Sequence, residues 1–514
     1  MVYPDIPGQW VPPVAMGLFT SILKNAGFEV DLFDATLYKK DDSFFLEVEK
    51  RVESGQVRKF SYEEALGTKL KSNLIEDFIS KIDSFKPDLL AVSVVEGAFK
   101  RALALLDSIK ERNIPHIVGG VFVTAAPEKT ISYSQINMIG IGEGENTILE
   151  VAKRLREGRG VDDVPNVWIK KSDGRVIKNS VGPLVDINKV LPDYSLFERA
   201  RFYRSMGGKV LKTVPLETSR GCPFTCTFCN APMWTKFYRE KCQTVFLRRK
   251  KIDRVIEEIE HLVKEHNPEL LYIIDDCFLA RPEEEFGEFV KKYGKIRLPF
   301  FIITRLEYVT EERMEQLRKI NCYRISVGVE HGNEEFRRNK LKRYISNEEL
   351  LKRLRILEQG AIPFSVNNII GFPDETRELI FDTIEFNRQI SGYDTLTVGI
   401  FTPYHGTELR AEAVQKGYLD PEVLAVHTRE SSLLRMPQFS AQQIDGLMRT
   451  FVMYVKFPKK WWPYLEKAEK FTPEGDAMFK KLSEIYHQVY LSGDQFQKPK
   501  EKPNWDKLEE EITI

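Results

Sequence analysis

Short apolar runs alternate with amphipathic segments along the N-terminal third of the chain. The helical spacing of apolar residues predicts a helix over 14–23, which Gly27 ends. Apolar runs predict strands at 28–33, 89–94, 116–120 and 138–142, and further helices at 100–112 and from Asn146. This alternation predicts a doubly wound, Rossmann-like α/β domain over residues 1–155. Only Met1, Val2 and Tyr3 precede Pro4, so its first strand is expected to be very short, replaced or absent.

A second and more regular series begins at residue 211. Its apolar strand segments lie at 212–217, 270–275, 300–305, 324–330, 364–370 and 396–401. Its helical segments lie at 251–266, 283–293, 310–319, 347–359 and 377–389. Six strand–helix units in a row predict a partial (β/α)6 TIM-type barrel over residues 211–410, with active-site groups at the C-terminal ends of its strands.

The remaining segments connect or cover these two units. Residues 156–210 form a connector, in which runs at 167–169 and 175–177 flank Asp173-Gly174 as in a β-hairpin. Residues 411–514 are mainly helical, and the charged, proline-containing stretch 497–514 is expected to be a loose tail. The charged insertion at 38–78 has a helical pattern to which we assign no role.

Composition narrows the class of protein. A chain of 514 residues favours two or three domains, and 42% hydrophobic residues suffice for sizeable cores. Lys plus Arg and Asp plus Glu both number 76, which gives no reason to expect nucleic acid as a partner. No apolar run approaches the roughly 18 residues of a membrane span, and the N-terminus does not resemble a signal peptide. Six sparse cysteines suit a cytoplasmic protein with one metal or cluster site rather than a disulfide framework.

Three of those cysteines form a C-x3-C-x2-C motif directly after the first barrel strand. Cys222, Cys226 and Cys229 can hold three irons of a cubane cluster and leave the fourth iron without a protein ligand. An open coordination site is what catalysis at a metal centre requires. The alternative is structural zinc, which would need a fourth ligand such as Cys242.

This motif, with the aromatic Phe228 just before its last cysteine, resembles the radical S-adenosylmethionine (SAM) superfamily. The resemblance implies a 4Fe–4S cluster that cleaves SAM to a 5′-deoxyadenosyl radical. It also implies cofactor contacts from strand ends along the barrel: Phe228, Asp275, Asp276, Arg305, Glu330, Ile370, Gly371 and Thr402. The structural alternatives are that the two aspartates cap a helix, that Glu330 forms a salt bridge at the barrel rim and that Gly371 serves a turn.

The N-terminal domain resembles the cobalamin-binding domain that precedes many radical SAM barrels. Ser93, the pair Gly119-Gly120 and the segment Gly142-Glu143-Gly144-Glu145 carry this resemblance. It implies that Ser93 faces the dimethylbenzimidazole tail of cobalamin and that Gly119 and Gly120 lie against it. There is no Asp-x-His-x-x-Gly motif, so no histidine is marked as a lower cobalt ligand. The alternative is a Rossmann-like domain that holds no cobalamin and serves packing or lid control.

Together the two resemblances imply cobalamin-dependent methylation of an unactivated carbon. The substrate would be a small or lipid-like molecule, and an external one-electron donor such as flavodoxin or ferredoxin would supply the electron. One alternative is a non-methylating radical SAM enzyme for oxidative cyclisation, rearrangement or lipid coupling. A methylthiotransferase would need a second cluster, for which Cys242, Cys277 and Cys322 are too dispersed. A zinc-stabilised, non-catalytic binding module is the remaining alternative.

Overall fold

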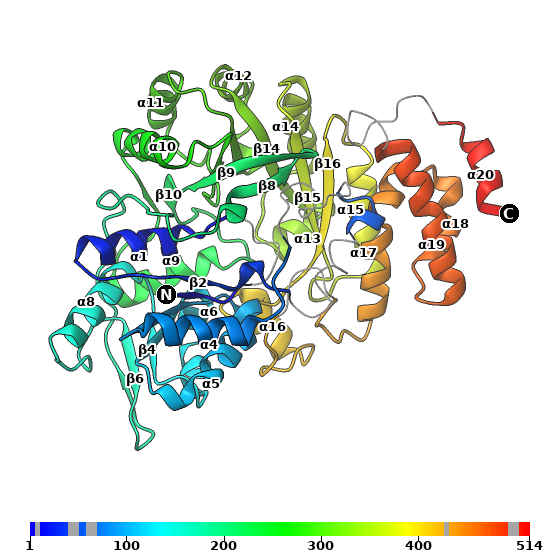
Figure 1. The fold of residues 1–514 in the computed structure, drawn as a ribbon. Coiled ribbons are helices and arrows are strands. Elements are labelled where there is room, and N and C mark those ends of the chain that lie inside the picture. Colours follow the sequence, from blue (N-terminus) through cyan, green and yellow to red (C-terminus); the bar gives the residue numbers. More distant parts are fainter. Residues whose placement is uncertain (6–10, 40–50, 58–68, 426–430, 492–502, 514) are drawn as a thin grey trace.

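The computed structural model describes residues 1–5, 11–39, 51–57, 69–425, 431–491 and 503–513. Within this part of the chain, two seven-stranded sheets and one two-stranded ladder carry the fold. Figure 1 shows the N-terminal half in blue and cyan beside the green and yellow barrel, and the orange and red C-terminal helices beyond β16. This arrangement confirms the predicted fold class: a Rossmann-like unit, a partial barrel and a helical C-terminal region.

The first sheet has the strand order β2-β1-β3-β4-β5-β6-β7. Its parallel strands are β1 (Val2–Tyr3), β2 (Phe33–Asp34), β3 (Leu90–Ser93), β4 (His116–Gly119) and β5 (Met138–Gly140). The antiparallel strands β6 (Val167–Lys170) and β7 (Val176–Lys178) confirm the predicted hairpin and extend this sheet. In a doubly wound sheet of this order, ligands bind beyond the carboxyl ends of the strands, where the winding direction reverses between β1 and β3.

Helices cover both faces of this sheet. They are α1 (Val14–Asn25), α4 (Leu74–Phe85), α5 (Phe99–Ser108), α6 (Val121–Ala125), α7 (Pro127–Ser132) and α8 (Glu145–Arg156). Helices α1 and α8 pack together over one apolar core, whereas α4 and α5 contribute to another. The predicted strand at 28–33 is wrong except for Phe33. Its partner β1 offers only two residues for pairing, so the ladder cannot extend further back along the chain.

The second sheet is the partial barrel. Its parallel strands are β9 (Lys209–Leu216), β12 (Leu270–Ile273), β13 (Phe300–Thr304), β14 (Cys322–Glu330), β15 (Phe364–Ile370) and β16 (Thr395–Ile400). Strand β8 (Tyr203–Met206) pairs antiparallel with β9 and forms one edge. The outer helices are α9 (Ala231–Cys242), α10 (Ile252–His266), α11 (Glu283–Tyr293), α12 (Glu311–Lys319), α13 (Glu334–Asn339), α14 (Asn347–Gln359) and α15 (Arg377–Asn387). Side chains of Thr310, Ser346 and Thr376 cap α12, α14 and α15, which explains their sharp starts.

The C-terminal region consists of α16 (Glu408–Gln415), α17 (Ala441–Lys456), α18 (Trp462–Ala468), α19 (Pro473–Tyr486) and α20 (Trp505–Thr513). Helix α17 packs on β16. The expectation of a loose tail is wrong for α20, because the Trp505 ring lies 5.6 Å from that of Phe457 and 5.1 Å from that of Trp461. Leu508 and Ile512 on the same helix are buried. No helix in the described ranges is long and apolar enough to cross a membrane.

Part of the insertion that we could not interpret from the sequence covers the free edge of the barrel. The side chain of Gln56 is fully buried, and its Oε1 accepts the backbone N–H of Val398 in β16 at 3.2 Å. The Ser483 hydroxyl of α19 donates to the carbonyl of Glu53 at 2.6 Å. Residues 51–57 are therefore held between β16 and the C-terminal helices. Residues 40–50 and 58–68 of the insertion lie outside the described residues.

Candidate active site

A cavity of about 630 Å³ lies between the two sheets and is lined by both halves of the chain. Ser93, Gly119 and Gly120 line it from the carboxyl ends of β3 and β4. Cys229 and Asp276 line it from the barrel. The structure therefore brings together residues that the sequence assigned to two different cofactors.

The N-terminal wall of the cavity is made largely of small residues. Gly120 has a φ of 123°, and a Cβ atom there would lie 2.3 Å from the carbonyl oxygen of Val94. Any larger residue at this position would collide with the backbone after β3. The neighbouring Gly119 has ordinary room for a Cβ, 3.4 Å from the nearest atom. A flat ligand can thus approach the backbone of this wall closely, and no histidine among the described residues lines the cavity.

The cysteine loop leaves the barrel through a short ladder. Strand β10 (Ser219–Arg220) pairs antiparallel with β11 (Arg248–Arg249), and the loop follows directly. Cys226 is buried, whereas Cys222 and Cys229 are partly exposed. Burial raises the pKa of Cys222 to about 12 and that of Cys229 to about 11. Burial thus favours the protonated thiols. Metal binding reverses this preference, because the thiolate is the form that binds a metal.

The donor set of this loop fits an iron–sulfur cluster better than a zinc ion. The loop supplies three thiols, one for each of three irons of a cubane, whereas structural zinc takes four ligands. The Cys242 thiol, the candidate fourth zinc ligand, donates instead to the carbonyl of Gly182 at 3.4 Å.

The two adjacent aspartates after β12 have different surroundings. Asp275 is buried, and its carboxylate accepts the backbone N–H groups of Thr218 and Ser219 at 2.7 and 3.0 Å. It also accepts both hydroxyls of these residues and Arg281 Nη2 at 3.1 Å. Asp276 is exposed to the cavity instead, and desolvation by the surrounding protein, helped by the charges of Asp275 and Glu217, raises its pKa to about 6.

Two further predicted residues lie near the loop as members of ion pairs. The Arg305 guanidinium pairs with Glu307, donates to Cys226 Sγ at 3.5 Å and stacks on the Phe224 ring, 3.6 Å from its centroid. Glu330 has a φ of 68° and lies 3.1 Å from Arg343 Nη1. Burial raises the pKa of Glu330 although Arg343 acts in the opposite direction.

The remaining predicted residues lie at the ends of β15 and β16, or, in the case of Phe228, pack against the loop that follows β15. The Phe228 ring packs 5.9 Å from that of Phe372, which follows Gly371. Gly371 has a φ of 82° and donates its N–H to the buried Glu375 carboxylate. The Ile370 side chain lies in the apolar core, and the hydroxyl of the buried Thr402 donates to the Ile400 carbonyl at 3.4 Å. Of this group, Phe228 and Gly371 are the ones placed at the loop that follows β15.

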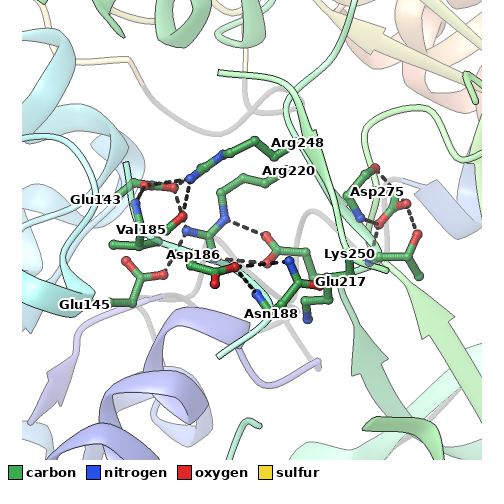
Figure 2. Close-up of polar contacts among 12 residues, drawn as sticks. Glu143, Glu145, Val185, Asp186, Asn188, Glu217, Arg220, Arg248, Lys250 and Asp275 are labelled. Carbon is green, nitrogen blue, oxygen red and sulfur yellow. Dashed lines mark hydrogen bonds and ion pairs between the residues drawn. The ribbon is translucent and has the colours of Figure 1, made fainter. Parts of the chain in front are cut away.

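A cluster of charged residues joins the two halves beside the cysteine loop and was not predicted from the sequence. Figure 2 shows Arg220 between Glu217 of the barrel and Glu143 and Glu145 of the N-terminal half. Arg248 reaches the same Glu143 carboxylate. In the sequence, Arg220 stands immediately before Gly221 and Cys222, and this position could have indicated that it helps to hold the cysteine loop.

A second contact joins the halves on another side of the barrel. The buried Glu96 carboxylate lies 2.6 Å from His405 Nδ1 and accepts the backbone N–H of His405 at 2.9 Å. It also accepts the backbone N–H of Ala425 at 2.7 Å. Glu96 follows β3, and His405 follows β16. Carboxylates of the N-terminal half thus hold loops of the barrel at two separate places.

Comparison with known protein families assigns both halves. Residues 216–386 match the Radical SAM superfamily, and residues 7–152 match the B12 binding domain. The chain therefore contains a radical SAM domain preceded by a B12-binding domain. These matches confirm the two resemblances drawn from the sequence and the cofactor classes that they implied.

Individual relatives and structures agree with this domain pair. An uncharacterised methyltransferase of Pyrococcus horikoshii is 25% identical over 397 residues, which are 74% of this chain and 82% of that protein. An anaerobic magnesium-protoporphyrin IX monomethyl ester cyclase of Rubrivivax gelatinosus is 27% identical. The aligned region covers 68% of this chain and 62% of the cyclase. The structure of the cobalamin-dependent SAM radical enzyme OxsB superposes with a TM-score of 0.62 at 16% identity, covering 95% of this chain and 71% of OxsB. The structural likeness confirms the fold.

Proposed function

We propose that this radical SAM enzyme, which joins a B12-binding domain to a radical SAM domain, methylates an unactivated carbon of a small or lipid-like substrate in a cobalamin-dependent reaction. One observation carries the proposal. The cavity of about 630 Å³ is lined from one side by Ser93, Gly119 and Gly120 and from the other by Cys229 and Asp276. Ligands held at the two walls would meet in one space, as methyl transfer between them requires.

The proposed ligand contacts follow from this geometry. Cys222, Cys226 and Cys229 would bind the 4Fe–4S cluster. The carboxylate of Asp276 faces the cavity, where it can accept a hydrogen bond from the amino group of SAM. Glu330, Gly371 and Phe228 would contact the rest of SAM, and the small residues Ser93, Gly119 and Gly120 would lie against cobalamin. Asp275, Ile370 and Thr402 support these loops, since their side chains contact the chain itself.

When bound, the cluster and cobalamin supply the one-electron cleavage of SAM and the carriage of a methyl group, respectively. The chain orients the ligands and limits access of water to them. Arg305 donates to Cys226 Sγ at 3.5 Å and so helps to hold this ligand in place. The electron must come from another molecule. We propose that an external one-electron donor such as flavodoxin or ferredoxin supplies it.

Anaerobic reconstitution tests the proposal. Protein supplied with iron, sulfide, hydroxocobalamin, SAM and dithionite should produce both 5′-deoxyadenosine and S-adenosylhomocysteine. Changing Cys222, Cys226 and Cys229 to alanine should abolish iron–sulfur absorbance and both products. Cys242→Ala is the matched control, because this thiol contacts the Gly182 carbonyl away from the loop. Wild-type protein that holds no iron, or a triple variant with full turnover, would refute the assignment.

Oxidative cyclisation is the second candidate, because one relative is a magnesium-protoporphyrin ester cyclase. The products distinguish the two reactions. Methylation consumes SAM both as radical source and as methyl donor, so S-adenosylhomocysteine accompanies 5′-deoxyadenosine. A cyclase would release 5′-deoxyadenosine alone. A methylthiotransferase is disfavoured, because its second cluster would need three further cysteines at one site. Cys277 contacts Thr304, Cys322 contacts the Arg324 carbonyl and Cys242 contacts the Gly182 carbonyl.

A further inference from the structure

Two arginines face each other in the ladder that leads into the cysteine loop. Arg220 of β10 is paired directly with Arg248 of β11. Side chains of directly opposed residues in an antiparallel pair lie on the same face, and like charges there are destabilising. Both side chains are largely buried, with exposed fractions of 16% and 19%, so solvent screens the repulsion only weakly. This ladder therefore needs negative charge from elsewhere.

The N-terminal half supplies that charge. Glu143 Oε1 accepts Arg220 Nη1 at 2.7 Å and also accepts Arg248, so a single carboxylate bridges both guanidinium groups (Figure 2). Glu145 adds a contact of 2.8 Å to Arg220 only. Within the barrel, Glu217 binds Arg220 through two contacts of 3.0 Å. Burial opposes ionisation of Glu217, yet its pKa is lowered, because Arg220, Lys250 and Arg248 together outweigh that cost. Glu143 is therefore the carboxylate of this cluster that contacts both arginines, and it is the one that Arg248 contacts.

The fold fixes Glu143 in this place. Its Oε2 accepts the backbone N–H of Val185 at 2.8 Å, and its own N–H donates to the Tyr238 hydroxyl at 2.7 Å. The glycines on either side have no room for a side chain. A Cβ on Gly142 would lie 2.7 Å from the Tyr238 hydroxyl, and one on Gly144 would lie 2.6 Å from the Phe19 ring. The carboxylate thus reaches the arginines only when the N-terminal domain is docked on α9.

We propose that Glu143 is a positioning residue through which the docked B12-binding domain holds the cysteine loop in order. Cys222 lies two residues after Arg220, so a loosened β10–β11 ladder loosens the loop. Docking of the N-terminal domain and assembly of the cluster site are then one coupled event. This inference rests on the proposed function only for the identity of the group that the loop binds. The coupling itself is a property of the chain without cofactors.

Alkylation of the loop thiols in cofactor-free protein tests the coupling. Under anaerobic conditions, the rates at which Cys222, Cys226 and Cys229 react with iodoacetamide are followed by mass spectrometry. We expect Glu143→Gln to raise these rates at least about tenfold, because Arg248 then faces Arg220 without its carboxylate partner. Glu150→Gln is the control: Glu150 pairs with Arg154 at 2.7 Å on the exposed side of α8, and its loss should leave the rates unchanged.

A double variant separates neutralisation from mere packing. Glu143→Gln combined with Arg248→Gln removes one of the two like charges, so we expect protection of the thiols to return toward the wild-type level. A structural role without charge coupling would instead make the double variant at least as reactive as Glu143→Gln. That result, or wild-type alkylation rates in Glu143→Gln itself, would overturn the proposal.

Reconstitution distinguishes this inference from the proposed function. If wild-type protein binds iron and cleaves SAM with dithionite, Glu143→Gln should hold less iron per chain, and the double variant should regain it. If wild-type protein binds no iron, the proposed function fails, while the alkylation rates still decide whether Glu143 orders the loop. Equal iron contents in wild type and Glu143→Gln would contradict the coupling.

Discussion

Asp275 and Asp276 are neighbours in sequence, and the structure predicts that replacing each by asparagine has a different consequence. The Asp275 carboxylate receives five hydrogen bonds from Thr218, Ser219 and Arg281 and none from the cavity side. An asparagine offers one oxygen in place of two. We therefore expect Asp275→Asn to loosen the segment that leads into the cysteine loop, whereas Asp276→Asn should leave that segment intact.

The size of the Asp275→Asn effect can be worked out from the contacts. If the amide nitrogen occupies the Oδ1 position, it faces the N–H groups of Thr218 and Ser219, and each stranded donor costs about 1–3 kcal/mol. If it occupies the Oδ2 position, it faces the buried Arg281 guanidinium, which then has Glu285 at 3.5 Å as its remaining carboxylate partner, at a cost of up to about 3–5 kcal/mol. Either orientation costs about 3 kcal/mol, which corresponds to a roughly hundredfold rise in local opening.

Hydrogen exchange measures this local opening without assuming that a multidomain protein unfolds in one step. The amides of Thr218 and Ser219 should exchange about a hundredfold faster in Asp275→Asn than in wild type, by the same reckoning. In Asp276→Asn their exchange should be unchanged, while SAM affinity falls. Unchanged exchange in Asp275→Asn would refute the structural role assigned to this carboxylate. Accelerated exchange in Asp276→Asn would show that the two roles are not separate.

Three further predictions concern other parts of the molecule. SAM affinity, measured by equilibrium dialysis, should fall as the pH drops below about 6, because the Asp276 pKa is raised to about 6 and protonation removes the hydrogen-bond acceptor. Asp276→Asn should abolish this pH dependence. Gly120→Ala should prevent retention of hydroxocobalamin on gel filtration, since its Cβ would lie 2.3 Å from the Val94 carbonyl oxygen. Trp505→Ala should make α20 susceptible to limited proteolysis, because the contacts with Phe457 and Trp461 are lost.

The strands of the barrel could be predicted because they are buried on both faces. A parallel strand such as β13, with the sequence Phe-Phe-Ile-Ile-Thr, is an almost continuous apolar run, and the predicted segment 300–305 matches it to within one residue. The strand at 28–33 failed for a different reason. Its length depends on β1, which lies 31 residues earlier and offers only two residues for pairing, and no local pattern records that. Local periodicity identifies elements well where the environment is uniform along the element.

Strand parity would have separated the two aspartates. Side chains on successive residues of a strand point to opposite faces. Ile274 and Asp276 share one parity, and both line the cavity. Asp275 shares the other parity with Leu271 and Ile273, which are fully buried. The sequence alone therefore predicts that Asp275 and Asp276 have different surroundings, provided that the alternation is continued beyond the end of β12.

The contacts between the two halves could not be predicted in the same way, because they depend on how two separately folded sheets meet. Glu143 follows β5 and Arg220 follows β9, and nothing in either segment specifies the other. The same holds for Glu96 after β3 and His405 after β16. All four lie beyond the carboxyl ends of strands, where the cavity also opens. Loops at the carboxyl ends of the strands thus line the cavity and hold the two sheets together, so we expect a substitution at either contact to alter the cavity even where the residue does not line it.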